Sequence, residues 1–269
     1  MTDAPSGSPT GRSSSVARLR AVGCVFAEEE ADLLHEAAAT SGALELLLRR
    51  RETGEPLEQI LGWVAFRGLR IAVAPGVFVP RVRTEFLVDT ALSLLRDGPA
   101  TVLDLCCGSG AIARAIAEER RDLRLLAADL SPAAVECARR TLHGIAAVFA
   151  GDLFEALPEP ERGRLDLVVV NAPYVPTSAI ALMPPEARLH EPTPTLDGGA
   201  DGLALHRRIA AESRGWLSPG GAVVIETSRE QAEATASVFS AGDFSTSIRL
   251  DDEREAMVVV ARSPRTTRV

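Results

Sequence analysis

Asn171, Ala172, Pro173 and Tyr174 directly follow the apolar run LDLVVV and could together hold an amino group. The side-chain carbonyl of Asn171 can accept one N–H bond, and the backbone carbonyl of Ala172 can accept a second. Pro173 restricts Ala172 to extended geometry, which aims that carbonyl, and Tyr174 offers a flat face to a planar amide or base. An amino group held in this way directs its delocalised lone pair at an electrophile, as methylation of an amide or an aromatic amine requires. Asn-x-Pro also occurs in ordinary turns after strands, so a structural role stays open.

A glycine-containing loop follows an earlier apolar run, in the stretch DLCCGSGAIARAIA at residues 104–117. Gly108 and Gly110 stand where a strand is expected to turn tightly into a helix, and such a turn needs residues without a Cβ. Asp129 follows at the end of the next expected strand, where a carboxylate can accept both hydroxyls of a ribose. Gly108, Gly110 and Ala113 fit the G-x-G-x-x-A fingerprint of a nucleotide-binding turn. Nicotinamide dehydrogenases and S-adenosylmethionine-dependent methyltransferases share this turn.

Two further acids favour the methyltransferase. Asp104 lies inside the end of the first strand, where its charge can face the amino group of a methionine tail but would be poorly placed beside a pyrophosphate. Asp152, in GDLF after the third strand, is positioned to meet an adenine amino group. The alternative is that these residues are only turn glycines and solvated acids. The adjacent Cys106 and Cys107 are poorly placed for a relaxed disulfide and are interpreted as small packing residues.

The composition excludes several kinds of active site. The 29 Lys and Arg residues are all arginine, so the chain has neither a Walker lysine nor a Schiff-base lysine. A net charge of −8 disfavours tight binding to a nucleic-acid backbone. The four cysteines and four histidines lack metal-ligand spacing, so no metal is expected. No apolar run resembles a signal peptide or a membrane span, which predicts a cytoplasmic protein.

The apolar patterns predict two domains. Residues 16–75 should form a small helical domain followed by a short hairpin at 63–73, because three segments carry apolar stripes at helical spacing. From 76 to 261, short apolar runs alternate with helical patterns, which predicts a mostly parallel sheet covered on both faces. The last run, MVVVA, should pair in antiparallel direction with the strand before it. Residues 1–15 are expected to be a disordered tail, and 262–269 a loose C-terminal tail.

Seven segments, taken in chain order, resemble the HemK-type, release-factor glutamine methyltransferase family: FVPRVRTE, VLDLCCGSGAIA, ADLSPAAVECARR, GDLF, VVVNAPYVP, EPTPTLDGGADGL and LSPGGAVVIE. The resemblance covers about residues 16–261. It implies a class I S-adenosylmethionine-dependent methyltransferase, with a Rossmann-like seven-stranded sheet and a small N-terminal helical domain that recognises the protein partner. Members methylate the side-chain amide of a glutamine in a protein, which leaves S-adenosylhomocysteine. The expected partner is a protein substrate that carries a glutamine in an exposed loop, and a class I release factor is a candidate.

The resemblance also implies roles for individual residues. The cofactor contacts are Cys106, Cys107, Gly108, Ser109, Gly110, Asp129, Asp152, Leu153 and Asn171. The glutamine amide would be bound by Asn171, Ala172, Pro173 and Tyr174, of which Asn171, Pro173 and Tyr174 are the expected catalytic residues.

This chain departs from the family pattern at three places. Ala172 replaces the first proline of Asn-Pro-Pro-Tyr, and Cys106 replaces the first glycine of the loop. The segment that commonly reads PRPETE is PRVRTE, in which Arg83 replaces an acid. These changes indicate a divergent branch whose substrate need not be a release factor.

Three other functions remain open from the residues alone. An adenine-amino methyltransferase acting on nucleic acid would use a related Asn-Pro-Pro-Tyr device, but the acidic charge weighs against it. A nicotinamide-dependent oxidoreductase would use the same glycine turn, and a non-catalytic binding module could keep the pocket. The long loop at 190–202 is expected to shape the entry for a substrate loop.

Overall fold

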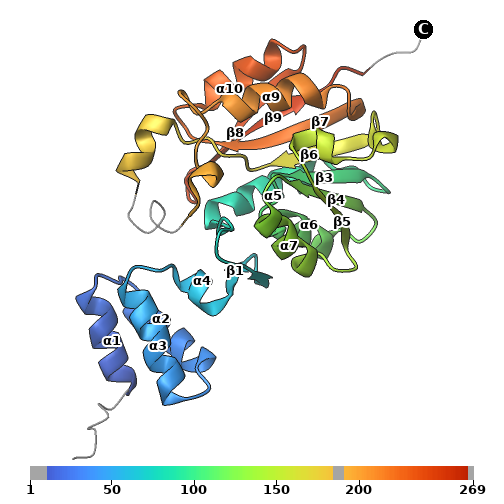
Figure 1. The fold of residues 1–269 in the computed structure, drawn as a ribbon. Coiled ribbons are helices and arrows are strands. Elements are labelled where there is room, and N and C mark those ends of the chain that lie inside the picture. Colours follow the sequence, from blue (N-terminus) through green and yellow to red (C-terminus); the bar gives the residue numbers. More distant parts are fainter. Residues whose placement is uncertain (1–10, 184–190, 266–269) are drawn as a thin grey trace, which may run out of the picture. The chain divides into compact units, whose positions relative to one another are not determined.

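The computed structural model describes residues 11–183 and 191–265 of the chain. The chain divides into two compact units, one ending at Trp63 and the other beginning at Val64 (Figure 1). This boundary differs from the predicted one at residue 75. The hairpin that we assign by pattern to the helical domain lies in the larger unit from Val64 onward. The reason is packing, because Phe66 and Ile71 are buried in the core of the larger unit.

Four helices form the smaller unit: α1 (Arg12–Ala21), α2 (Ala27–Ala37), α3 (Ser41–Glu52) and α4 (Leu57–Leu61). Their shared core includes the fully buried side chains of Leu19, Leu34 and Leu48. The first helix begins at Arg12, so residues 12–15 are helical and not part of a tail as predicted. Ser15 explains the difference, because it is buried and its Oγ lies 3.0 Å from Nε2 of His35 on α2. Residues 1–10 lie outside the described residues.

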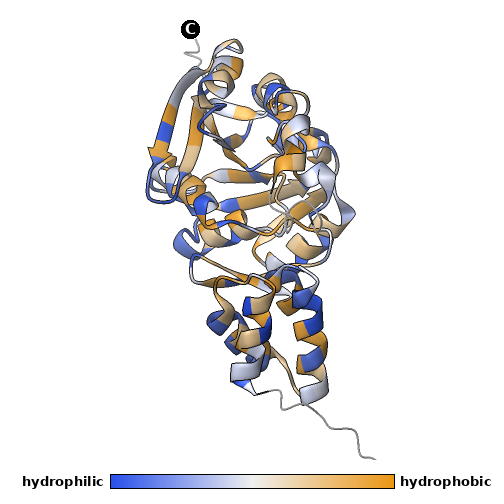
Figure 2. Cartoon of the chain, turned by 90° about the vertical axis from the view of Figure 1, so that its left-hand side faces the viewer, coloured by the Kyte–Doolittle hydropathy of each residue, from blue (hydrophilic) through white to orange (hydrophobic). Residues whose placement is uncertain are grey.

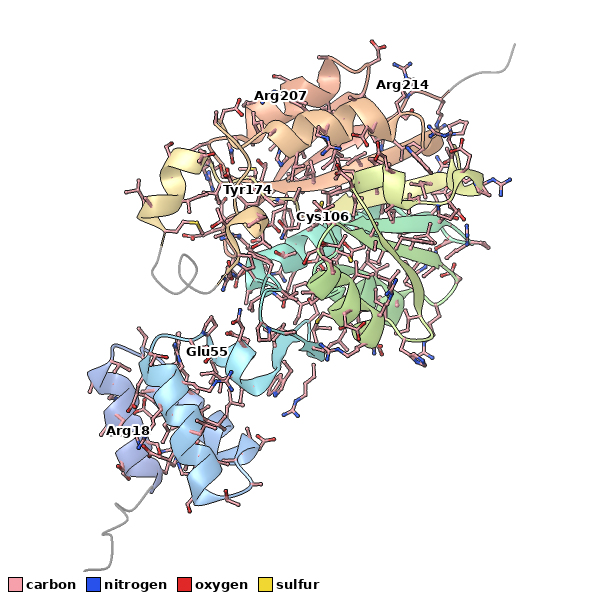
Figure 3. All side chains as sticks on the ribbon, in the orientation of Figure 1. Arg18, Glu55, Cys106, Tyr174, Arg207 and Arg214 are labelled. Carbon is pink, nitrogen blue, oxygen red and sulfur yellow. The ribbon has the colours of Figure 1, made fainter. Side chains whose placement is uncertain are left out.

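Charged residues complement the helix ends of this unit. Glu28, Glu29 and Glu30 occupy the first turn of α2, and Arg49, Arg50 and Arg51 occupy the last turn of α3, as the helix dipole favours. Each of the three arginines pairs with a glutamate of the same unit, namely Glu45, Glu55 and Glu30 respectively. Arg18 of α1, labelled in Figure 3, pairs with both Glu45 and Glu52. The basic run is therefore engaged in internal ion pairs.

The larger unit contains a seven-stranded sheet in the order β5-β4-β3-β6-β7-β9-β8 (Figure 1). Its strands are β3 (Thr101–Leu105), β4 (Arg124–Asp129), β5 (Ala146–Ala150), β6 (Leu165–Val170), β7 (Leu217–Thr227), β8 (Ser245–Asp251) and β9 (Ala256–Arg262). The first five are parallel, and β9 runs antiparallel to both β7 and β8. The predicted mostly parallel sheet and its antiparallel last pair are confirmed. The final strand includes Arg262, and Ser263 still donates to the Gly221 carbonyl at 2.9 Å, so the predicted loose tail begins too early.

Helices cover both faces of this sheet. They are α5 (Glu85–Leu94), α6 (Ala111–Glu119), α7 (Pro132–Thr141), α9 (Ala204–Ser213) and α10 (Ala232–Ser240). Short 3-10 turns are η1 (Val82–Thr84), η2 (Leu153–Ala156), η3 (Glu159–Glu161), η4 (Thr177–Leu182) and η5 (Thr193–Thr195). Apolar residues dominate the central strands (Figure 2), as burial on both faces requires. In the described part of the chain, no helix is long and apolar enough to cross a membrane.

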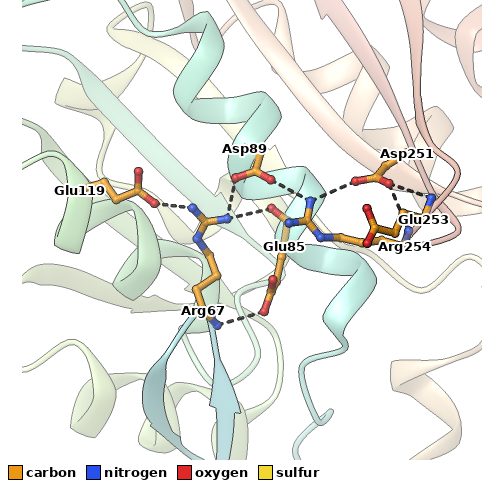
Figure 4. Close-up of polar contacts among 7 residues, drawn as sticks. All are labelled: Arg67, Glu85, Asp89, Glu119, Asp251, Glu253 and Arg254. Atoms are coloured by element: carbon orange, nitrogen blue, oxygen red, sulfur yellow. Dashed lines mark hydrogen bonds and ion pairs between the residues drawn. The ribbon is translucent and has the colours of Figure 1, made fainter.

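A network of charged residues fixes the hairpin of β1 (Trp63–Phe66) and β2 (Leu69–Ala72) to the helices beside it (Figure 4). Arg67, at the turn, donates its backbone N–H to Oε1 of Glu85 at 3.0 Å and its Nη1 to Oδ1 of Asp89 at 2.6 Å. Its Nη2 also pairs with Glu119 of α6. Arg254 reaches the other oxygen of Asp89 at 3.0 Å. These contacts anchor the start of α5, which follows the segment that enters the candidate site.

His206 is buried between α9 and α10 and is not a surface residue. It is fully buried, and its Nδ1 lies 3.0 Å from Oγ1 of Thr235. Burial lowers the pKa of His206 from 6.5 to about 4, with a smaller contribution from the charge of Arg207. The unfolded chain therefore takes up a proton at this histidine at a higher pH than the folded chain does.

We predict that this histidine destabilises the fold in acid. Between the unfolded pKa of 6.5 and the folded pKa of about 4, the unfolded state binds the extra proton, so stability falls as the pH falls through that window. The loss should reach roughly 3 kcal/mol at its largest. Urea unfolding of wild type and His206→Asn across this range measures it, because the variant should show a shallower loss. His143→Asn, at an exposed site, should follow wild type; equal slopes in all three proteins would contradict the prediction.

Candidate active site

A cavity of about 510 Å³ lies in the larger unit where the strands β3, β4 and β6 end. Ten of the predicted site residues line it: Cys106, Cys107, Gly108, Ser109, Asp129, Leu153, Asn171, Ala172, Pro173 and Tyr174. Cys106 and Tyr174 are labelled in Figure 3. The carboxyl ends of neighbouring parallel strands meet at one edge of a sheet, which brings these segments together. Asp104, Gly110 and Asp152 are not among the described residues that line the cavity.

The loop after β3 has the backbone geometry of a tight nucleotide-binding turn. Gly108 has a φ of +54° and donates its N–H to Oδ2 of Asp129 at 2.8 Å. Cys106 has a φ of +59°, a conformation that side chains with a Cβ adopt only at a cost of roughly 1–2 kcal/mol. Burial raises the pKa of both thiols, Cys106 and Cys107, and neither forms a disulfide. The two cysteines are therefore packing residues of the loop, with protonated thiols at neutral pH.

Asp129 joins this loop to the next strand. Its Oδ2 accepts from Gly108 N, and its Oδ1 accepts from Ser131 N at 2.8 Å. Each oxygen keeps a second lone pair that a ribose hydroxyl could use. Burial raises the pKa of Asp129, and the backbone N–H groups of Ser131, Gly108 and Leu130 oppose that rise. The carboxylate is thus held in a fixed orientation at the cavity wall.

The three predicted site residues that do not line the cavity contact other parts of the chain. Asp104 is buried under the loop, where its Oδ2 accepts from Ala113 N at 3.0 Å, and burial raises its pKa to about 8. Gly110 faces helix α7, because a Cβ there would lie 2.9 Å from Cδ1 of Leu142. Asp152 forms two hydrogen bonds of 3.1 Å with Arg208. These contacts hold the three residues within the chain, and their contact with a cofactor stays a prediction.

The segment from Asn171 to Tyr174 presents hydrogen-bond acceptors to the cavity. Asn171 donates its Nδ2 to Oγ1 of Thr84 at 3.2 Å, which leaves its Oδ1 as the free acceptor. Ala172 is buried, with 2% of its surface exposed, and Pro173 follows it. Tyr174 donates its hydroxyl to Oε1 of Glu226 at 3.2 Å. Asn171 and Tyr174 are therefore each held by a side chain from another part of the chain, Thr84 and Glu226 respectively.

The glycine-rich loop at 196–202 packs against the backbone of Tyr174. A Cβ on Gly198 would lie 2.8 Å from the Tyr174 Cα, and one on Gly202 would lie 2.2 Å from the Tyr174 carbonyl. Gln231 donates to that same carbonyl at 2.8 Å and to the carbonyl of Asp201 at 3.0 Å. The loop therefore holds Tyr174 in place, a role that we do not predict from its length and glycine content. His190, at its start, lies outside the described residues.

Sequence reasoning missed several residues around the cavity. Four of them line the cavity, namely Arg81, Arg83, Thr84 and Glu191. A fifth, Glu226, is not among the lining residues and accepts a hydrogen bond from the Tyr174 hydroxyl. Glu226 stands at the end of the apolar run GAVVIE, the same kind of signal that identifies Asn171 after LDLVVV. Among the described residues, no cluster of three or more His, Cys, Asp or Glu side chains could hold a metal ion.

The strand order and the position of the cavity define a class I methyltransferase fold. A methyltransferase from Pyrococcus furiosus has the same fold, with a TM-score of 0.54 and 16% identity over 74% of this chain and 90% of that one. Residues 68–185 match the family described as methyltransferase small domain.

Two curated relatives are more similar in sequence. The release factor glutamine methyltransferase of Geobacter sulfurreducens is 40% identical over 203 residues, which cover 74% of this chain and 69% of that protein. The 4-amino-L-phenylalanine/4-methylamino-L-phenylalanine methyltransferase of Streptomyces pristinaespiralis is 37% identical over 72% of this chain and 68% of that protein. The chain belongs to the release factor glutamine methyltransferase family. The predicted family, fold class and enzyme class are confirmed, and the oxidoreductase alternative is set aside.

We predict that Gly202→Ala disrupts the site by steric overlap. A methyl group there would meet Nε2 of Gln231 at 2.1 Å and the Tyr174 carbonyl at 2.2 Å, so backbone must move. Gly163→Ala is the matched control, since its φ of +72° is similar to the +76° of Gly202 but no atom lies within 4 Å of a new Cβ. In urea unfolding, the control should lose about 1 kcal/mol and Gly202→Ala about 2–4 kcal/mol. Equal losses would show that the loop does not pack on Tyr174 as described.

Proposed function

We propose that this chain transfers a methyl group from S-adenosylmethionine to the side-chain amide nitrogen of a glutamine in a protein substrate, a class I release factor. The observation that carries this proposal is the orientation of Asn171. Its Nδ2 donates to Thr84, so its Oδ1 is the amide atom that can accept a hydrogen bond, and Asn171, Ala172 and Tyr174 all line the cavity. Two acceptors next to a flat aromatic face suit a primary amide, whose two hydrogens lie in one plane.

The residues at the ends of β3 and β4 fit S-adenosylmethionine. Ser109 lines the cavity, and within the described chain its buried Oγ has no hydrogen-bond partner, so a polar ligand group would satisfy it. Nothing lies within 4 Å of a Cβ built on Gly108, which leaves room for close approach of a ligand. We propose that Cys106–Ser109 and Leu153 surround the cofactor and that Asp129 accepts its ribose hydroxyls. When bound, the cofactor supplies a methyl group already activated by a sulfonium.

The chain's own residues would contribute positioning and electrostatics. Asn171 and the Ala172 carbonyl hold both hydrogens of the amide, while the Tyr174 ring supports its plane. Pro173 keeps this segment extended. Because the nitrogen lone pair is then aimed at an activated carbon, alignment of the two reactants provides most of the rate. This transfer needs no lysine, and the chain contains none. We place the protein in the cytoplasm, where release factors act.

A free aromatic amine is the second acceptor class to test. The relative from Streptomyces pristinaespiralis is named for methylating 4-amino-L-phenylalanine. In this chain Arg81 and Arg83 both line the cavity, and an arginine there could hold the carboxylate of a free amino acid. The same pair of acceptors would hold the aromatic amino group.

The acceptor can be identified with labelled-methyl S-adenosylmethionine and the purified chain. Separate reactions would contain class I release factors, total cell protein, 4-amino-L-phenylalanine and nucleic acid. Mass spectrometry should locate one methyl group on a glutamine of a release factor. Label only on the free amine would instead support the second class, and label only on adenine would overturn both.

We predict that Asn171→Ala removes turnover while cofactor binding stays close to wild type. Loss of the Asn171 oxygen that accepts from the substrate amide should lower kcat by about 100-fold or more. The Kd for S-adenosylhomocysteine should change by less than about threefold, because the cofactor would lose at most one weak hydrogen bond. Single-turnover methyl transfer and calorimetric titration measure the two quantities. Ser178→Ala, at an exposed position shortly after Tyr174, is the control. It should keep the wild-type kcat and the wild-type Kd for S-adenosylhomocysteine. Unchanged turnover in Asn171→Ala would contradict the proposed role.

A further inference from the structure

Glu226 is a buried carboxylate behind the acceptor site. It lies near the end of β7, with 2% of its side chain exposed, and is not among the residues that line the cavity. Its Oε1 accepts from the Tyr174 hydroxyl at 3.2 Å and from Nε of Arg83 at 3.3 Å. A buried carboxylate without such partners would be strongly disfavoured. These two contacts connect the carboxylate to two residues of the cavity wall that lie far apart in the sequence.

Arg83 supplies the charge that offsets this burial. Its side chain is 46% exposed, so it keeps contact with water while its Nε reaches the carboxylate. Burial raises the pKa of Glu226, and the charge of Arg83 together with the hydrogen bonds from Arg83 and Tyr174 opposes that rise. The ionised form is an acceptor only, and it therefore fixes the direction in which each of its neighbours donates.

Thr84, next to Arg83 in the chain, holds the side chain of Asn171. Its own side chain is buried, and its Oγ1 accepts from Nδ2 of Asn171 at 3.2 Å. With Nδ2 engaged, Oδ1 is the atom of the amide that can accept a hydrogen bond from a ligand.

We propose that Glu226 is a positioning residue for the acceptor amide, holding the Tyr174 ring through the hydrogen bond with its hydroxyl. The proposal rests on the proposed function, because the amide that the Tyr174 ring supports is the acceptor named there. Glu226 touches no reacting atom. Its effect is to keep one contact of the substrate in a fixed orientation, so its loss should impair catalysis more than cofactor binding.

The first test is Glu226→Gln, which preserves size but replaces two acceptor oxygens with one acceptor and one donor. We expect kcat for methyl transfer to fall about 10- to 100-fold, while the Kd for S-adenosylhomocysteine changes by less than about threefold. Glu161→Gln is the matched control, since Glu161 is also a nearly buried partner of an exposed arginine, Arg124, but lies away from the cavity. A kcat within about twofold of wild type in Glu226→Gln would overturn the proposal.

A second test separates a positioning role from general loss of structure. Tyr174→Phe removes the hydroxyl through which Glu226 acts. Glu226→Gln should therefore cost less in the Tyr174→Phe background than in wild type. Fully additive losses would mean that Glu226 acts by another route. Should Glu226→Gln fail to fold, Tyr174→Phe alone must still lower kcat with cofactor binding kept, and a wild-type kcat there would overturn the proposal.

A spectroscopic readout tests the contact without any methyl transfer. Tyr174 is the only tyrosine, so labelling with ¹³C-tyrosine gives one ring signal for the chain. Its chemical shift should change in Glu226→Gln and stay at the wild-type value in Glu161→Gln. An unchanged signal in Glu226→Gln would overturn the proposal whatever the substrate is. If wild type methylates no glutamine, the proposed function fails, whereas a shifted signal would still establish the Glu226 contact.

Discussion

Burial of a parallel sheet on both faces confines polar side chains to the ends of its strands. In this chain the interiors of β3, β4 and β6 are almost entirely apolar, and acids or amides appear where each strand ends. Asp129, Asn171 and Glu226 occupy equivalent places at the ends of three different strands. The parallel direction of the strands then brings these residues to one edge of the sheet. The position of the active site follows from this constraint before any particular chemistry is considered.

Side chains and a loop outside the segment from Asn171 to Tyr174 determine how firmly Tyr174 is held. Tyr174 is restrained through its hydroxyl by Glu226 and through its carbonyl by Gln231. The glycines at 198 and 202 let the neighbouring loop approach the tyrosine backbone more closely than any side chain would allow. The loop is thus part of the support of the site. Deleting or lengthening it would disturb the orientation of the tyrosine as well as access to the cavity.

The segment from Asn171 to Tyr174 lies at the cavity, as expected, because its sequence signal is local. An asparagine after a buried strand, followed by a proline and the one tyrosine, carries its own geometry. The contacts of Gly110 and Asp152 within the chain were not predictable, since their neighbours Leu142 and Arg208 come from distant parts of the chain. The hairpin was assigned to the wrong unit for a similar reason. Alternation of apolar residues predicts two strands, but it does not say which core those residues join.

Arg83 shows how a departure from the family pattern changes a site without changing its fold. An acid at this position would place a second negative charge next to the buried carboxylate of Glu226, whereas the arginine neutralises it. The pair of Arg83 and Glu226 is neutral overall, and only its cationic member, Arg83, lines the cavity. A substrate with a carboxylate near the methylated nitrogen would gain from that charge, and one with a neutral loop would depend on shape alone. Under the proposed function, the charge at position 83 would bear on which substrate is methylated, while the hydrogen-bond acceptors at Asn171 and Ala172 would bear on the chemistry.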